Sequence, residues 1–92
     1  MNVEWADAAR ESVTRVATDL RQWSVPAAEK LVEAVAQAAL RIERFPESGR
    51  IVPEFATPLI REVIVARYRL VYERFPDRVE IVAFHPSAIP FD

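Results

Sequence analysis

Cysteine is absent from the sequence, and histidine and glycine each occur only once. Without cysteine the chain has no disulfide framework, no thiolate zinc site, no iron–sulfur cluster and no cysteine nucleophile. The single histidine, His85, excludes a zinc site built from several histidines. The single glycine, Gly49, excludes glycine-rich phosphate loops and dinucleotide-binding motifs. We therefore expect a protein that works without a metal or a cofactor.

Long apolar runs are also missing. No stretch approaches the roughly 18 residues that span a bilayer, and the first four residues carry an acid but no basic region that would begin a secretory signal. We expect a cytoplasmic protein that does not contact a membrane. Its 92 residues, 51% hydrophobic and 28% charged, predict one domain over residues 1–92 with a modest core.

Positive charge does not exceed negative charge, and it is unevenly distributed. The formal net charge is −2, so we expect no direct binding to DNA, which favours basic proteins. The cations are eleven arginines and one lysine, and five of the arginines lie between residues 61 and 78. Arginine offers a planar fork suited to bidentate contacts, although scattered arginines more often lie on solvated faces.

The first half of the chain predicts a strand followed by a helix hairpin. Residues 2–5 alternate in the manner of a strand. Apolar residues then recur at spacings of four and three over residues 6–23 and again over residues 27–45, which predicts two amphipathic helices. Ser24 and Pro26 between them are typical of a helix start, and a connection this short predicts antiparallel helices.

The second half changes to β-type residues. Residues 50–58 contain two prolines and predict a loop, whereas residues 59–65, 68–75 and 79–84 are rich in β-branched and aromatic residues. Turns are expected at 66–67 and 76–77, and an irregular tail at 86–92. The order β-α-α-β-β-β predicts an α+β fold of two layers, with the hairpin packed on a mostly antiparallel sheet. Alternation alone leaves open which strand face meets the helices.

A few polar residues are candidates for chemistry. Arg69 lies inside an apolar run, so it is either paired with an acid such as Glu54 or Glu62 or directed at an anion. His85 ends the last predicted strand, where a lone histidine is more often structural than catalytic. The acids Glu54, Glu62 and Glu73 are possible bases, but solvated surface positions are favoured for them. The aromatic side chains of the strands could stack on bases, but core packing is favoured.

Several short motifs, in order along the chain, resemble the RelE/ParE superfamily of type II toxin–antitoxin toxins, which includes plasmid stabilisation proteins. They are Val3-Glu4-Trp5, Arg44-Phe45-Pro46-Glu47-Ser48-Gly49-Arg50, Ile60-Arg61-Glu62-Val63, Tyr68-Arg69-Leu70-Val71-Tyr72 and Val79-Glu80-Ile81-Val82-Ala83-Phe84-His85. The resemblance covers essentially the whole chain. It implies the same β-α-α-β-β-β fold and a cognate antitoxin that wraps around the helix hairpin and sheet edge in a hetero-oligomeric complex.

Within this superfamily the sequence is more similar to the ParE-like branch, whose members inhibit DNA gyrase by binding it. The alternative is a RelE-like endonuclease that cuts mRNA on the ribosome, for which the resemblance implies catalysis by Arg69 with Glu54 or His85 as acid or base. The tail after His85 lacks arginine, lysine and tyrosine, which counts against mRNA cleavage. A third possibility is a toxin fold that only binds partners. The residues expected to bind the target or the antitoxin are Arg50, Arg61, Arg67, Arg69, Tyr72 and His85.

Overall fold

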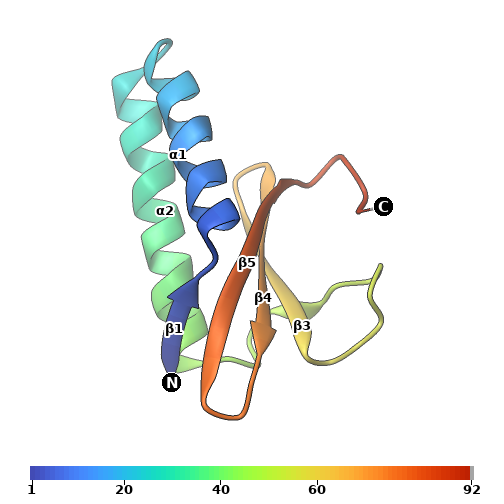
Figure 1. Cartoon of the computed structure of the whole chain (residues 1–92). Helices are drawn as coiled ribbons and strands as arrows, with labels where there is room; N and C mark the ends of the chain where they lie inside the picture. The colour runs from blue at the N-terminus through green and yellow to red at the C-terminus, as the bar shows by residue number, and fades with distance from the viewer. Residues whose placement is uncertain (92) are drawn as a thin grey trace.

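Two helices pack against one face of a five-stranded sheet (Figure 1). This computed structural model describes residues 1–91, so Asp92, the end of the predicted domain and tail, lies outside the described residues. The elements, in chain order, are β1 (Asn2–Trp5), α1 (Asp7–Arg21), α2 (Val25–Arg44), β2 (Arg50–Ile51), β3 (Ile60–Val65), β4 (Tyr68–Arg74) and β5 (Arg78–Pro86). The predicted two-layer α+β fold is confirmed.

The helix hairpin follows from its sequence signals. Ser24 caps α2, because its side-chain oxygen accepts a hydrogen bond from the Ala27 backbone N–H at 3.2 Å, and Pro26 occupies the first turn, where no backbone N–H is needed. The apolar stripe of α2 is buried toward the sheet and α1. Its buried residues are Ala28, Leu31, Val35, Ala38 and Ile42.

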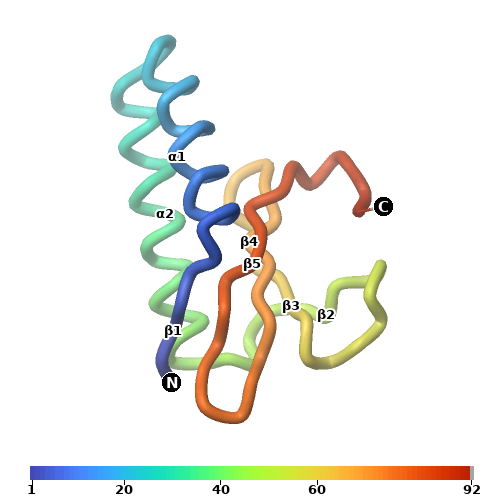
Figure 2. The backbone as a smooth tube through the Cα atoms, in the orientation of Figure 1, coloured from blue at the N-terminus to red at the C-terminus, as the bar shows by residue number. Residues whose placement is uncertain are grey.

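The sheet has the strand order β1-β5-β4-β3-β2, with β1 parallel to β5 and all other neighbours antiparallel (Figure 2). The strand β2 corrects the prediction that residues 50–58 form only a loop. Arg50 and Ile51 pair with Glu62 and Arg61 of β3, and Pro53 follows after one further residue, Val52. Two residues are too few to show a strand period, so only the pairing with a distant segment reveals this edge.

The face of β4 that meets the helices carries Tyr68, Leu70 and Tyr72. The aromatic residues of this face thus pack in the core, as with Tyr68 stacked on Phe84 at 4.5 Å between ring centroids. They are not a platform for nucleic-acid bases. Arg69 and Val71 point to the opposite face and are buried as well.

A β-bulge in β5 decides where His85 lies. Val71 pairs with Ala83, but the next residue of β4, Tyr72, pairs with Ile81, so Val82 is left without a partner. The extra residue reverses the alternation beyond it. His85 therefore faces outward, opposite Arg69 in the register of β4 and β5.

Within residues 1–91 no helix has the length and apolarity needed to cross a membrane. Across the same described part of the chain, no three histidine, aspartate or glutamate side chains gather as metal ligands do.

Candidate functional site

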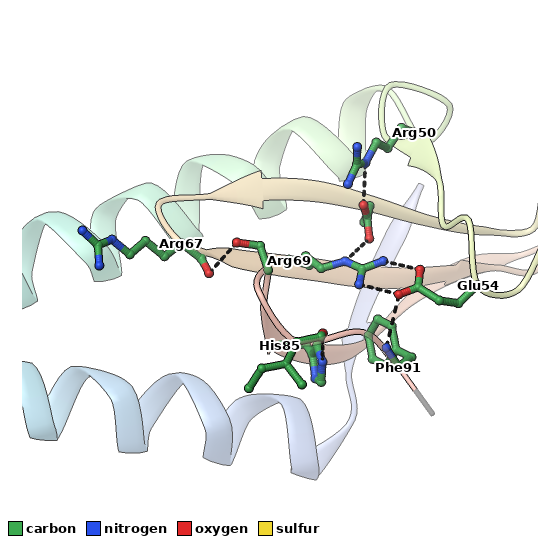
Figure 3. Close-up of polar contacts among 9 residues, drawn as sticks. Arg50, Glu54, Arg67, Arg69, His85 and Phe91 are labelled. Carbon is green, nitrogen blue, oxygen red and sulfur yellow. Dashed lines mark hydrogen bonds and ion pairs between the residues drawn. The ribbon is translucent and has the colours of Figure 1, made fainter.

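A chain of ion pairs crosses the outer face of the sheet, the face that the helices do not cover (Figure 3). Arg69 of β4 is its centre, with a side chain only 5% exposed. Its Nε donates to Glu62 Oε1 at 2.6 Å, and its Nη1 and Nη2 donate to the two oxygens of Glu54 at 2.8 and 2.7 Å. The guanidinium thus binds Glu62 through Nε alone and Glu54 bidentately through both terminal nitrogens.

Glu62 is the buried residue that connects Arg69 to Arg50 in this series of ion pairs. Its residue is 1% exposed, and its second oxygen, Oε2, accepts a hydrogen bond from Arg50 Nε. The expectation that Glu62 is a solvated surface acid is therefore wrong. The register explains why, because Glu62 pairs with Arg50 across β2 and β3 and lies diagonally from Arg69, two residues from its partner Ile64.

The ion pair between Glu54 and Arg69 stabilises the charged form of both groups. The hydrogen bonds from Arg69, opposed by partial desolvation, hold the pKa of Glu54 well below its ordinary value, at about 2. The hydrogen bonds to Glu54 and Glu62 raise the pKa of Arg69 in return. Counted by residue type, the two acids of these ion pairs, Glu54 and Glu62, balance the two arginines, Arg50 and Arg69. The cluster of Arg50, Glu54, Glu62 and Arg69 therefore has no net charge to offer an anion.

The segment after β5 brings Phe91 against this cluster (Figure 3). Ser87 is tied by its backbone N–H and its hydroxyl to the carbonyl of Arg67, both at 2.8 Å. The ring of Phe91 stacks on His85 at 4.1 Å between centroids, and the Arg69 guanidinium lies 4.7 Å from the centre of the Phe91 ring. The sequence predicted only an irregular tail here, because no local pattern indicates which side chain a terminal phenylalanine will contact.

The structure brings Glu54, Arg69 and His85 together, although Glu54 comes from the loop after β2 and His85 from β5. Arg69 binds Glu54 directly, whereas His85 reaches the pair through the Phe91 ring between them. A guanidinium, a carboxylate and an imidazole are groups that can bind an anion and transfer protons. In this arrangement, however, every nitrogen of Arg69 already donates to a carboxylate.

The other predicted binding residues lie outside this cluster. The Arg61 guanidinium donates to the backbone carbonyls of Glu47, Gly49 and Pro58 at 3.3, 3.0 and 3.0 Å, so it ties the β2 region to the start of β3. Arg67 is exposed in the β3–β4 turn, and its side chain extends away from Arg69 in Figure 3.

Tyr72 lies on the opposite side of the sheet from the ion pairs and is fully buried. Its hydroxyl donates to the Pro46 carbonyl at 2.7 Å and accepts from the Gly49 N–H at 3.0 Å. Burial raises the pKa of this hydroxyl. Tyr72 thus joins β4 to the connection between α2 and β2, and it presents no surface to a partner in this structure.

The chain is similar to known toxins in both sequence and fold. A family model described as the ParE toxin of type II toxin–antitoxin system, parDE, matches residues 3–89. A solved structure described as a chromosomal ParDE TA system from P. aeruginosa has a TM-score of 0.73 at 13% identity, with 94% of this chain and 95% of that chain covered. A YoeB/ParE toxin from Agrobacterium tumefaciens has a TM-score of 0.66 at 15% identity, with 94% and 98% covered. No curated protein matches the chain. At these identities the two structures show a shared fold.

Proposed function

The chain belongs to the ParE toxin family of type II toxin–antitoxin systems, and from this premise we propose that it is the toxin of such a module. In this proposal a cognate antitoxin neutralises it in a hetero-oligomeric complex, and the free toxin inhibits DNA gyrase in the cytoplasm. It does so by binding the enzyme, without chemistry of its own.

The pairing of Arg69 carries this proposal. An RNA-cutting toxin needs free cations to hold the phosphates and to stabilise the negative charge of the transition state. Here Arg69 is 5% exposed and makes three hydrogen bonds to Glu54 and Glu62. Two acids balance the two arginines of the cluster, and the whole chain carries a net charge of −2. This balance favours a protein target over RNA.

The proposed antitoxin partner is supported by an apolar groove on the helix hairpin. The groove has a volume of about 490 Å³ and lies between α1, α2 and the edge strand β1. Val32 and Leu40 of α2 remain 44% exposed there, which is unfavourable for a protein without a partner. An amphipathic segment of an antitoxin fits such a groove by burying its own apolar side chains. The apolar lining residues are Val3, Trp5, Val13, Val32, Val35, Ala36, Ala39 and Leu40.

One observation favours the RelE-like mRNA endonuclease as a second candidate. Glu54, Arg69 and His85, named as its catalytic residues from the sequence, do meet on one face of the sheet. For this activity the substrate phosphate would have to replace Glu54 on Arg69, and Phe91 would have to leave. The carboxylate and the imidazole would then flank the phosphate as base and acid.

Two assays with the purified protein distinguish these functions. The proposed function expects loss of DNA supercoiling by purified gyrase, reversed by prior mixing with the antitoxin, while ribosome-bound mRNA stays intact. Cleavage of the mRNA, abolished by Arg69→Ala in a variant shown to be folded, would favour the nuclease instead. If neither activity appears and expression without the antitoxin leaves growth unchanged, the chain is a partner-binding member of the fold without toxicity, and the proposal is wrong.

A further inference from the structure

The Phe91 side chain contacts residues from three separate parts of the chain, of which Figure 3 shows His85 and Arg69. The His85 ring stacks on it at 4.1 Å with an interplanar angle of 22°, the Arg69 guanidinium lies at 4.7 Å, and the Phe55 ring is tilted against it at 5.4 Å. Planar groups on several sides select a flat aromatic ring, through stacking and the attraction between a guanidinium and a π-face.

The same site also binds the backbone of the segment that carries this ring. His85 Nε2 lies 2.6 Å from the Ile89 carbonyl oxygen and therefore donates to it. Glu54 Oε2 accepts from the Phe91 backbone N–H at 3.2 Å. One donor and one acceptor thus engage a carbonyl and an N–H two residues apart, which fixes the direction in which this segment lies across the site.

The segment that carries Phe91 is weakly held apart from these contacts. Residues 87–90 are exposed, and Ile89 is 54% exposed. Beyond the ties to His85 and Glu54, its hydrogen bonds run from Ser87 to Arg67 and from Ile89 back to Pro86. Replacing it would expose little apolar core, so another peptide with the same features could take its place.

We propose that Glu54, Phe55, Arg69 and His85 form a peptide-binding site, and that residues 89–91 occupy it as an internal ligand until a partner displaces them. The ligand is a peptide segment of a partner protein that carries an aromatic residue. The backbone N–H of this residue binds Glu54, and the carbonyl of the residue two positions earlier accepts from His85. The neutral charge of the cluster and its backbone contacts favour a peptide over a nucleotide. The proposal rests on the proposed function only in taking the partner to be a protein.

Residues 89–91 compete strongly with any free peptide, because they are covalently attached to the protein close to the site. A tethered segment acts at an effective concentration that reaches the millimolar range for short linkers. A free peptide of the same sequence should therefore bind the wild-type chain poorly. It should bind measurably better once the internal ring is removed.

NMR of the full-length protein tests this directly, because the only histidine of the chain, His85, gives a single set of ring signals. In Phe91→Ala these signals should move from their wild-type positions, since the ring stacked at 4.1 Å is lost. Phe45→Ala, which truncates a phenylalanine that is 63% exposed at the end of α2, is the matched control and should leave them in place. An unchanged indole signal of Trp5, which packs against the core, would show that each variant is folded, and Phe91→Leu serves if Phe91→Ala is not folded.

The probe is the synthetic peptide Pro-Ser-Ala-Ile-Pro-Phe-Asp, the sequence of residues 86–92. At millimolar concentration it should return the His85 signals of the Phe91→Ala chain toward their wild-type positions, while the same peptide with alanine for phenylalanine should not. The proposal is overturned if His85 is insensitive to Phe91→Ala, or if both peptides act alike. It is also overturned if adenosine monophosphate moves the signals and the peptide does not. No gyrase or antitoxin is present, so this result and the supercoiling result can fail independently.

Discussion

Glu62→Gln tests the idea that one buried carboxylate organises the outer face of the sheet. Glu62 is 1% exposed and gives one oxygen to Arg69 and the other to Arg50. Glutamine keeps the shape but has only one acceptor oxygen, so its NH2 group must face one of the two arginine donors. The Arg50 side chain is 61% exposed, against 5% for Arg69. Because water can solvate Arg50, we expect the amide oxygen to turn toward Arg69.

The magnitude follows from what Arg69 retains. It keeps both hydrogen bonds to Glu54 but exchanges a charged acceptor for a neutral one in a buried position. Hydrogen bonds to charged groups contribute about 1.5–3 kcal/mol, so we expect the free energy of unfolding to fall by about 1.5–3 kcal/mol. A domain of 92 residues has a total stability of roughly 5–14 kcal/mol. The loss should therefore shift the midpoint of urea unfolding clearly, as followed by circular dichroism.

Two further variants make this prediction specific. Arg50→Gln should cost less than Glu62→Gln, because the Arg50 side chain is 61% exposed and the new amide group can still donate a hydrogen bond to Glu62. Glu29→Gln, an exposed acid on α2, should stay within about 0.5 kcal/mol of the wild type. The reasoning is refuted if Glu62→Gln costs no more than Glu29→Gln, or if Arg50→Gln is as damaging as Glu62→Gln.

Three other changes have defined outcomes. In Gly49→Ala the new Cβ would lie 2.6 Å from the Tyr72 hydroxyl, so thermal unfolding should show a loss of about 1–3 kcal/mol; an unchanged melting temperature would contradict this packing. Ser24→Ala removes the cap of α2 and should lower the free energy of unfolding by about 0.5–2 kcal/mol, whereas Ser24→Asp should restore it. The pKa of Glu54 falls from 4.5 to about 2 on folding, so its ion pair stabilises the protein fully above pH 4.5 and progressively less as the pH falls through about 2. Glu54→Gln should remove this part of the acid dependence in urea unfolding at stepped pH, and an identical acid profile would contradict the Glu54–Arg69 pairing.

The large elements could be predicted from the sequence because their signals are local. The 3.6-residue period of the helices, the cap at Ser24 and the β-branched runs each lie within a few residues, and the structure confirms them. The strand β2 could not be predicted, because Arg50 and Ile51 become a strand only by pairing with β3. The motifs around Arg69 and His85 indicated the family before any geometry was available, and the match over residues 3–89 confirms it.

The site was predicted as a set of residues but not as an arrangement. Arg69 within an apolar run required either an acid or an anion, and the sequence offered both Glu54 and Glu62 without choosing. The structure uses both acids, one from β3 and one from the loop after β2. The role of Phe91 had no local signal, since its contacts depend on the path of the whole C-terminal segment.

By itself, then, the sequence determined the fold class, the family and the residues from which the outer face is built. Only the tertiary structure decided which of these side chains lie on the same face of the sheet and contact one another. The unpaired Val82 reverses the alternation of β5 and turns His85 to the same face as Arg69, which strict alternation from Ile81 would have prevented. The loop carrying Glu54 and the segment carrying Phe91 then close over Arg69. These contacts join residues far apart in the chain, and no periodic pattern encodes a bulge or a pairing between segments that local sequence does not connect.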